Sequence, residues 1–203
     1  MSLLDKFGAY ADLRDELLRH GTLPFGVVTE QILSPTEGIV RGKRTILAGT
    51  NNYLGLTFDA DAIAAGQAAL ASEGTGTTGS RMANGTYAGH LALEQEIARF
   101  FDRRHALVFT TGFSATMGMV GALAGRDDVL LIDADCHASI YDGCRLSGAE
   151  ILRFRHNDVA DMEKRLRRLG DRARNTLVVT EGLYSMLGDQ APLEAMVDVK
   201  DRY

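Results

Sequence analysis

The sequence of 203 residues contains no tryptophan, only three prolines and only two cysteines, and it has no excess of positive charge. Two cysteines, Cys136 and Cys144, are too few for a disulfide scaffold, and we interpret both as reduced thiols in a protein interior. Acidic residues outnumber lysine and arginine by 27 to 22, which gives a formal net charge of −5. Because proteins that grip a nucleic-acid backbone usually carry the opposite balance, we expect no nucleic-acid partner.

The sequence also lacks a recognisable secretion signal and a segment suited to span a membrane. The first residues contain early acidic side chains and no apolar core before a small-residue cleavage site. One uncharged stretch, 107–125, contains four glycines, three threonines and one serine. These residues make insertion into lipid unfavourable, so we expect no transmembrane segment and a cytoplasmic location.

The beginning of the chain, residues 1–55, predicts a helix followed by an extended arm. Leucines recur at helical spacing up to residue 19, and Gly21 is placed to end that helix. Residues 22–50 break into short extended pieces, with Gly42 and Lys43 at a predicted hairpin turn. We treat this segment as distinct from the remainder of the chain.

Residues 56–203 predict the first part of a large domain in which helices and strands alternate. Helices are predicted at 59–73, capped by Asp59 or Asp61 and ended by Gly74, and at 90–101. Strand-like apolar runs follow at 106–111, 129–135, 150–156 and 176–182. Helical stretches separate them at 112–124, 138–147 and 158–169. This alternation predicts an α/β fold with an incomplete, mostly parallel sheet that is covered on both faces.

Polar segments follow three of the predicted strands and mark their carboxyl ends. These segments are 111–113, 133–137 and 181–185. Ligands of open α/β sheets bind outside the carboxyl ends of the strands. A helix that begins at Gly112 would offer free N–H groups and the positive end of its dipole to a phosphate. Gly112 is also compatible with a turn that needs glycine for geometry alone, and His137 with a hydrogen-bonded structural role beside Asp135.

Other motifs have simpler interpretations. The glycine-rich segment 74–89 matches neither GxGxxG after a strand nor GxxxxGK[ST], so both nucleotide fingerprints are excluded and a surface loop is one alternative. Basic residues between 164 and 174 alternate with acids and indicate a solvated helix face. The basic side chains of Arg41, Lys43 and Arg44 could attract an acidic ligand or protect a hairpin edge. The two cysteines have no spacing typical of a metal site, and we predict no metal.

Five motifs in a fixed order carry a family resemblance. They are GTNNYLG (49–55), GTGTTGSRMANGTYAGH (74–90), FTTGFSAT (109–116), DADCHASIYDG (133–143) and TEGLYSMLGDQAPL (180–193). Together they resemble the pyridoxal-phosphate-dependent α-oxoamine synthases over essentially the whole chain. The SMLGD sequence at 185–189 is similar to the soluble bacterial branch that uses L-serine.

The resemblance implies a fold-type-I, aminotransferase-like architecture that binds pyridoxal 5′-phosphate and works as a homodimer. By this similarity His137 would stack on the pyridine ring and act in catalysis. The cofactor-binding residues would be Gly112, Phe113, His137, Glu181 and Ser185. The substrate-binding residues would be Asn51, Asn52 and Arg81.

The implied reaction is the condensation of L-serine with a long-chain acyl-coenzyme A, such as palmitoyl-coenzyme A, with loss of carbon dioxide. Its product would be 3-ketosphinganine, the first intermediate of sphingolipid biosynthesis. A substrate with a long acyl chain could also bring the enzyme to the surface of the inner membrane.

One part of the family pattern lies outside these 203 residues. The Schiff-base lysine and the aspartate that pairs with the pyridine nitrogen come later in the family, and Lys200 stands too early to be that lysine. We therefore expect these residues to be inactive by themselves. The alternatives are an α-oxoamine synthase that uses glycine or alanine, a non-catalytic partner chain, and an unrelated nucleotide-binding protein, which the missing GxGxxG disfavours.

Overall fold

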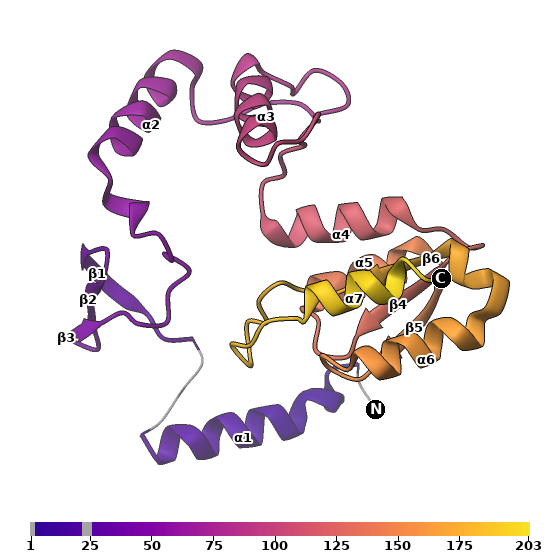
Figure 1. Cartoon of the computed structure of the whole chain (residues 1–203). Coiled ribbons are helices and arrows are strands. Elements are labelled where there is room, and N and C mark those ends of the chain that lie inside the picture. The colour runs from indigo at the N-terminus through magenta and orange to yellow at the C-terminus, as the bar shows by residue number, and fades with distance from the viewer. Residues whose placement is uncertain (1–2, 22–25) are drawn as a thin grey trace. The chain divides into compact units, whose positions relative to one another are not determined.

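The computed structural model describes residues 3–21 and 26–203, which divide into two compact units, Met1–Gly85 and Thr86–Tyr203. Figure 1 shows the elements of both. The first unit contains η1 (Asp5–Phe7), α1 (Gly8–Arg19), β1 (Thr29–Ser34), β2 (Glu37–Val40), β3 (Lys43–Ile46), η2 (Leu56–Phe58) and α2 (Ala60–Glu73). The helix predicted near the start of the chain is therefore confirmed as α1. Part of the predicted extended arm, residues 22–25, lies outside the described residues.

The strands β1, β2 and β3 form a small antiparallel sheet in that order. The turn between β2 and β3 consists of Arg41 and Gly42, whose φ angles are 51° and 70°. Two positive φ angles are typical of a type I′ hairpin, which matches the twist of the paired strands. The predicted turn at Gly42 and Lys43 is thus one residue too late, because Lys43 already pairs with Val40.

The helix α2 begins and ends at the residues that the sequence indicated. The carboxylate of Asp59 accepts a hydrogen bond of 2.9 Å from the N–H of Ala62, so Asp59 is the cap and Asp61 lies within the first turn. Gly74 ends the helix with a φ of 84°, which glycine adopts without a steric penalty.

The second unit contains one more α-helix than the sequence predicted, together with the short 3₁₀ helix η3. Its elements are α3 (Ala88–Phe100), α4 (Gly112–Leu123), β4 (Val129–Asp133), α5 (Ala138–Ser147), β5 (Glu150–Phe154), α6 (Val159–Leu169), η3 (Gly170–Asn175), β6 (Thr176–Val179) and α7 (Leu193–Lys200). The four predicted helices in this unit are confirmed within two residues at each end. The additional helix α7 is only eight residues long and begins directly after Pro192.

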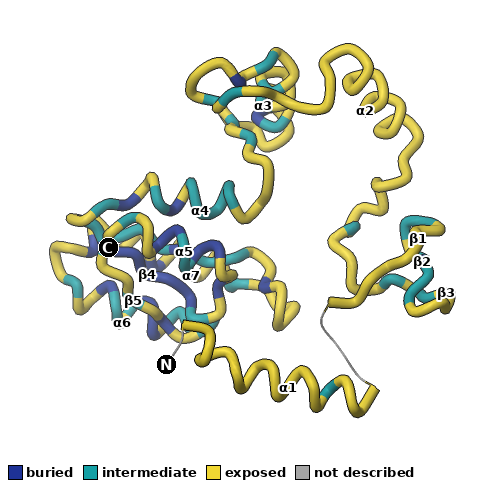
Figure 2. Tube along the Cα trace, turned by 180° about the vertical axis from the view of Figure 1, so that it is seen from behind, coloured by how far each residue is buried: buried dark blue, intermediate teal, exposed yellow. Residues whose placement is uncertain are grey.

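The three strands of the second unit form a parallel sheet with β4 in the centre and β5 and β6 beside it. Ile132 of β4 pairs with Arg153 on one side and Val179 on the other. All five residues of β4 are buried, as Figure 2 shows. The predicted parallel α/β sheet is therefore confirmed for three strands, which end two to three residues earlier than expected.

The prediction of a strand at residues 106–111 is wrong. This segment has no regular secondary structure. A strand exists through its ladder of hydrogen bonds, and here the N–H of Val108 donates instead to the carboxylate of Glu94 on α3, at 3.0 Å. The apolar run shows that these residues suit a strand, but it carries no information about a pairing partner.

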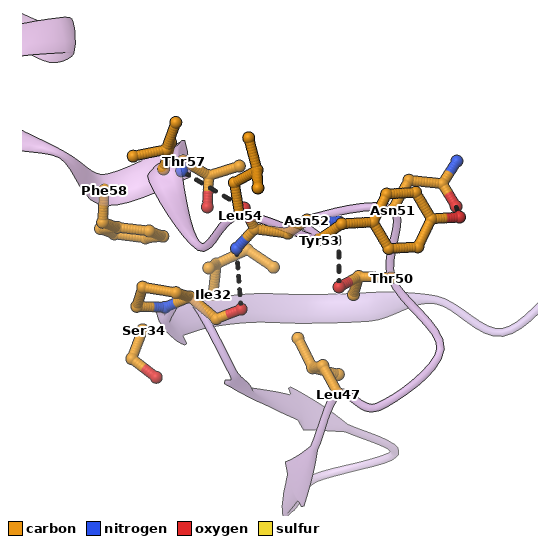
Figure 3. Close-up of a pocket in the computed structure, with 12 residues that line it drawn as sticks. Ile32, Ser34, Leu47, Thr50, Asn51, Asn52, Tyr53, Leu54, Thr57 and Phe58 are labelled. Atoms are coloured by element: carbon orange, nitrogen blue, oxygen red, sulfur yellow. Dashed lines mark hydrogen bonds between the residues drawn. The ribbon is translucent and has the colours of Figure 1, made fainter.

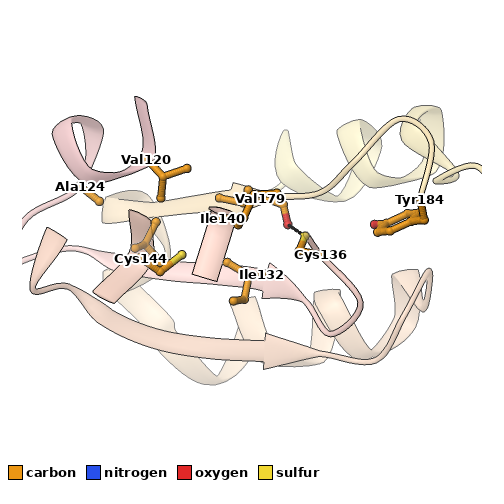
Figure 4. Packing of buried hydrophobic residues seen from close by; sticks show 9 residues of the cluster. Val120, Ala124, Ile132, Cys136, Ile140, Cys144, Val179 and Tyr184 are labelled. Carbon is orange, nitrogen blue, oxygen red and sulfur yellow. Dashed lines mark hydrogen bonds between the residues drawn. The ribbon is translucent and has the colours of Figure 1, made fainter. Parts of the chain in front are cut away.

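Helices cover both faces of the parallel sheet because side chains alternate along β4. Leu130 and Ile132 belong to one buried cluster with residues of α4 and α5, part of which is drawn in Figure 4. Leu131 belongs to a second cluster with residues of α6 and α7. Each fully buried side chain of this size stabilises the fold by about 1.5–3 kcal/mol. The sheet is therefore a rigid base for groups at its carboxyl edge.

Candidate functional site

The first turn of α4 offers free backbone N–H groups. The hydroxyl of Thr111 accepts the N–H of Ser114 at 3.0 Å and caps the helix. The N–H groups of Gly112 and Phe113 have no partner among the described residues. A Cβ built on Gly112 would meet nothing within 4 Å, so its backbone is open to an incoming group. Free amides and the positive helix end suit an anion such as a phosphate.

His137 caps the next helix, α5, with its side chain. Its Nδ1 accepts the N–H of Ser139 at 3.2 Å and lies 2.8 Å from the hydroxyl of the same serine. Because Nδ1 accepts the amide proton, the neutral ring carries its own proton on Nε2. Nε2 has no partner in the described part of the chain, so it is available to donate a hydrogen bond to a ligand.

Three segments that are far apart in the sequence meet at this edge. The rings of Phe113 and His137 lie 6.2 Å apart in an edge-to-face arrangement. The backbone N–H of His137 donates to the carboxylate of Glu181, which follows β6. The structure therefore brings together the start of α4, the start of α5 and the end of β6 as predicted, although only the last two of these segments follow observed strands.

Ser185 lies on a short hairpin-like loop, which we define as residues 183–190. Leu183 and Gln190 form an isolated bridge, and the N–H of Tyr184 donates to the carbonyl of Asp189 at 2.9 Å. Ser185 is exposed at the turn of this loop. Among the described residues no hydrogen bond or ring contact joins Ser185 to the residues around His137.

Sequence reasoning missed a cluster at the same edge, centred on His156. Its Nδ1 lies 2.9 Å from Oδ1 of Asp133, and its Nε2 lies 2.9 Å from Oδ2 of Asp189. Asn157 donates its backbone N–H to Oδ2 of Asp133 at 2.8 Å. We define Asp133, His156, Asn157 and Asp189 as the edge cluster. A signal for it existed, because His156 and Asn157 directly follow a strand, but the predicted strand extended through His156.

The hydrogen bonds of the edge cluster set its charges. Burial by itself would raise the pKa of Asp133, but hydrogen bonds from the N–H groups of Asn157 and Asp135 and from His156 outweigh burial and lower it below the usual range. The hydrogen bonds to Asp133 and then to Asp189 raise the pKa of His156 above its ordinary value. Asp133 is therefore ionised and His156 is stabilised in its protonated form.

Two other titratable groups near this edge are held neutral. Burial raises the pKa of Cys136 to about 12, and the negative charges of Glu181 and Asp133 act in the same direction. Burial also raises the pKa of Tyr184 to about 12. A thiol with such a pKa is a poor nucleophile. Both Cys136 and Cys144 are buried and form no disulfide, which agrees with their interpretation as interior thiols.

The predicted substrate residues lie in the first unit. Asn51 and Asn52 line an open cavity of about 930 Å³ with apolar side chains that include Ile32 and Phe58 (Figure 3). The amide of Asn52 is fixed on both sides, because it donates to the carbonyl of Pro35 at 3.4 Å and accepts the N–H of Thr57 at 3.4 Å.

Asn51 lies at the same cavity as Asn52, and Arg81 lies in a later turn of the first unit. The side-chain oxygen of Asn51 accepts a hydrogen bond of 3.2 Å from the hydroxyl of Tyr53. Arg81 is half-buried in a turn and lies outside the residues that line this cavity. Asn51 and Asn52 thus line one cavity, and Arg81 is not among its lining residues.

No group of three or more His, Cys, Asp or Glu side chains in residues 3–21 and 26–203 is arranged to hold a metal ion. Among the helices that the structure describes, none has the length and apolar character needed to cross a bilayer.

Comparison with known proteins identifies a family. The sequence profile of the family described as aminotransferase class I and II matches residues 43–203. A serine palmitoyltransferase of Caulobacter vibrioides is 56% identical over 200 residues, which are 98% of this chain and 50% of that protein. A putative 8-amino-7-oxononanoate synthase of Desulforudis audaxviator is 45% identical over 161 residues, or 79% of this chain and 41% of that protein.

A solved structure gives the corresponding result for the fold. The serine palmitoyltransferase of S. paucimobilis with bound PLP–myriocin aldimine has a TM-score of 0.95 and 52% identity, and the match covers 100% of this chain and 51% of that chain. The aminotransferase-like fold predicted from five motifs is thereby confirmed. The chain spans about half the length of the relatives it matches.

Proposed function

This chain belongs to the aminotransferase class I and II family, and we propose on that premise that the whole protein condenses L-serine with a long-chain acyl-coenzyme A. The products would be 3-ketosphinganine, coenzyme A and carbon dioxide, and the reaction would begin sphingolipid biosynthesis. The observation that carries this proposal is the 56% identity to a serine palmitoyltransferase over nearly all of this chain. The SMLGD sequence at 185–189 points to the same substrate.

The residues at the carboxyl edge of the sheet fit pyridoxal 5′-phosphate, the cofactor named with the S. paucimobilis structure. Gly112 and Phe113 offer free amides beside an open backbone, and the ring of His137 stands next to them. When bound, this cofactor supplies an electron sink for the negative charge that forms at the α-carbon of the amino acid. Gly112 and Phe113 would hold its anionic or polar groups, and His137 would cover one face of its ring.

His137 has a second task in the proposal. Its Nδ1 is occupied by Ser139, which fixes the orientation of the ring and leaves the proton on Nε2. Nε2 can therefore donate a hydrogen bond to the carboxylate of L-serine and hold the amino acid in one orientation. The carboxylate of Glu181 fixes the backbone of His137, and we propose that Ser185 approaches the cofactor from the loop 183–190.

For the acidic end of the substrate we propose Asn51, Asn52 and Arg81. The amide of Asn52 has a fixed orientation, and an oriented amide recognises a carboxylate without the cost of ordering a free side chain.

The division of the chain into residues 1–55 and residues 56–203 also stays a prediction.

A second candidate function is the synthesis of another aminoketone from glycine or alanine. It is favoured by the 45% identity to a putative 8-amino-7-oxononanoate synthase, which is lower than the 56% identity to the serine palmitoyltransferase of Caulobacter vibrioides. The two candidates differ in the amino acid that the protein accepts. A site for L-serine would gain a hydrogen bond to the hydroxyl, and sites built for such a group reject analogues that lack it.

The test is a competition among amino acids. The whole protein, loaded with pyridoxal 5′-phosphate, is incubated with palmitoyl-coenzyme A and L-serine, glycine or L-alanine, and the lipid product is identified by mass spectrometry. We expect 3-ketosphinganine from L-serine, with coenzyme A released in equal amount, and a higher kcat/KM for serine than for either analogue. A preference for glycine or alanine would contradict the proposal.

We further propose that the whole protein is a homodimer. Many apolar side chains of the first unit are exposed, including Leu54 and Leu70, and a subunit interface would bury such side chains. Light scattering of the whole protein is expected to give twice the mass of one chain, and a monomer at micromolar concentration would contradict this.

For the location of the protein we propose the cytoplasm, with reversible contact to the inner membrane through the long acyl chain of the substrate. More protein should sediment with vesicles that contain palmitoyl-coenzyme A than with vesicles that lack it. Equal recovery with both kinds of vesicle would contradict the contact.

A further inference from the structure

We propose that His156 is a positioning residue, whose imidazolium bridges Asp133 to Asp189 and thereby holds the loop 183–190 at the carboxyl edge of the sheet. The anchoring concerns the fold alone. Its consequence for catalysis, through Ser185 on the same loop, rests on the proposed function.

Counting hydrogens shows why both ring nitrogens of His156 donate. Nδ1 faces Asp133, an ionised carboxylate that accepts and cannot donate. Nε2 faces Oδ2 of Asp189 at 2.9 Å. The side-chain nitrogen of Asn157 also lies 3.2 Å from Nε2, but its two hydrogens point to Oδ2 of Asp189 at 3.0 Å and to the carbonyl of Gln190 at 3.2 Å. Only the doubly protonated ring satisfies both carboxylates.

The two ends of this bridge lie in different surroundings. The side chain of Asp133 is fully buried at the end of β4, and the N–H groups of Asp135 and Asn157 fix its carboxylate. Asn157 reaches this position with a φ of 53°, a left-handed conformation that asparagine tolerates. The side chain of Asp189 is 45% exposed on the loop. His156, whose side chain is 19% exposed, therefore connects the rigid core to a solvent-facing segment.

Apart from the hydrogen bonds of His156 and Asn157, the loop is attached to the second unit mainly through Tyr184. The apolar side chains of its remaining residues are exposed, namely Leu183, Met186 and Leu187. Tyr184 is buried, and its ring packs edge-to-face on His156 at 4.4 Å and 89°. Its hydroxyl lies 2.7 Å from the hydroxyl of Thr180. Tyr184 and Asp189 therefore both contact His156, through its ring and through Nε2 respectively, and Asn157 adds hydrogen bonds to Asp189 and to the carbonyl of Gln190.

Negative charge surrounds this imidazole. Asp133 and Asp135 face it from the end of β4, with Oδ2 of Asp135 at 3.7 Å, and Asp189 faces it from the loop, where the ring of Tyr184 is neutral. Loss of the proton would leave one ring nitrogen with its lone pair against a carboxylate. The anchor should therefore weaken as the pH rises through the value at which His156 loses its proton.

Hydrogen exchange of the loop in the whole protein tests the proposal without using catalysis. The variants are His156→Gln and Asp189→Asn, and the matched control is His105→Gln, an exposed histidine in the segment before α4. Protection of the loop amides, corrected for intrinsic rates, is expected to fall at least tenfold in both variants. It should be unchanged in the control, and the amides of β4 should stay protected in all four proteins.

The pH profile separates this role from a general effect on packing. In the wild type, protection of the loop should fall as the pH rises from 6 to 9, and this fall should be absent in His156→Gln. Unchanged loop protection in both variants, or the same pH profile in wild type and His156→Gln, would overturn the proposal. Because Asp189 is partly exposed, Asp189→Asn provides the test if His156→Gln fails to fold. A failure of the serine condensation assay would leave these results unaffected.

Discussion

The two three-stranded sheets of this chain differ in almost every physical respect. In β1, five of six residues are exposed, and the sheet is antiparallel and local in sequence. In β4, all five residues are buried, and its partners lie about 20 and 50 residues farther along the chain. The difference shows where chemistry can be held precisely, because only the second sheet fixes the positions of groups at its edge from both faces.

The polar groups of the two regions follow the same contrast. In the first unit the ion pair between Arg44 and Glu37 joins neighbouring strands in solvent, where such pairs contribute little. At the edge of the parallel sheet, Asp133 is fully buried and accepts hydrogen bonds from residues on separate segments. The charge of Asp133 at that edge is therefore held in place by groups of the buried core.

The largest expected effect is in the core of the second unit. Leu131→Ala should lower the free energy of unfolding by about 2–5 kcal/mol, because it removes buried methyl groups and leaves a cavity beside α6 and α7. Ile46→Ala on β3, where the side chain is 76% exposed, should change it by less than about 0.5 kcal/mol. Urea unfolding of the whole protein measures both, and equal losses would remove the contrast between the sheets.

The next effect concerns pH. Because the pKa of His156 is raised in the folded state, its pairing stabilises the protein fully below the unfolded pKa of about 6.5 and is lost as pH rises through the folded pKa. His156→Gln should lower the free energy of unfolding by about 1.5–3 kcal/mol at pH 6, the usual range for hydrogen bonds to charged groups. The cost should shrink by pH 9. A cost that is the same in urea titrations at both pH values would contradict the assigned charge.

Two helical glycines give a smaller and opposite pair of effects. A Cβ at Gly143 of α5 would lie 3.0 Å from the carbonyl oxygen of Met117 on α4, so Gly143→Ala should destabilise by about 1–3 kcal/mol. A Cβ at Gly66 of α2 meets nothing within 4 Å, and Gly66→Ala should stabilise that helix by about 0.5–1 kcal/mol. Thermal unfolding measures the first, and hydrogen exchange of α2 the second. A higher thermal stability of Gly143→Ala would contradict the close packing of α4 and α5 at this position.

The smallest effects are those of the helix caps. Asp59→Ala should lower the stability of α2 by about 1 kcal/mol and leave the transition of the second unit unchanged. The control Asp61→Ala, in the first turn but not at the cap, should have less effect. Asp158→Ala, which uncaps the half-buried helix α6, should lower the global transition. Hydrogen exchange of α2 measures the local effect, and urea unfolding measures the global one. A change in the global transition in Asp59→Ala would contradict the expectation that this cap acts on α2 alone.

Much of this fold follows from local sequence patterns. The apolar runs and the helices between them predicted β4, β5, β6 and the helices that cover them, because a central strand that is buried on both faces, such as β4, leaves a continuous apolar signature. Residues 106–111 carry the same signature, yet they form no strand because a strand also needs a partner. The helix α7 escaped prediction because eight residues after a proline show too little periodicity.

The site was predictable only in part. The rule that ligands lie beyond strand ends pointed to Phe113, His137 and Glu181, which the structure brings together. It did not find the edge cluster, because His156 was assigned to the interior of a strand. Its link to Asp189 spans 33 residues of sequence, and no local pattern records such a pairing.

The edge beside His137 is the proposed binding site of the cofactor, and one titration tests this placement most directly. Titration of the whole protein with pyridoxal 5′-phosphate, followed by absorbance, compares wild type with His137→Leu and with the exposed control His105→Leu. We expect about tenfold weaker binding in His137→Leu, since an aromatic contact contributes up to about 1.5 kcal/mol, and no change in the control. Equal affinity in all three proteins would contradict the placement of the cofactor at this edge.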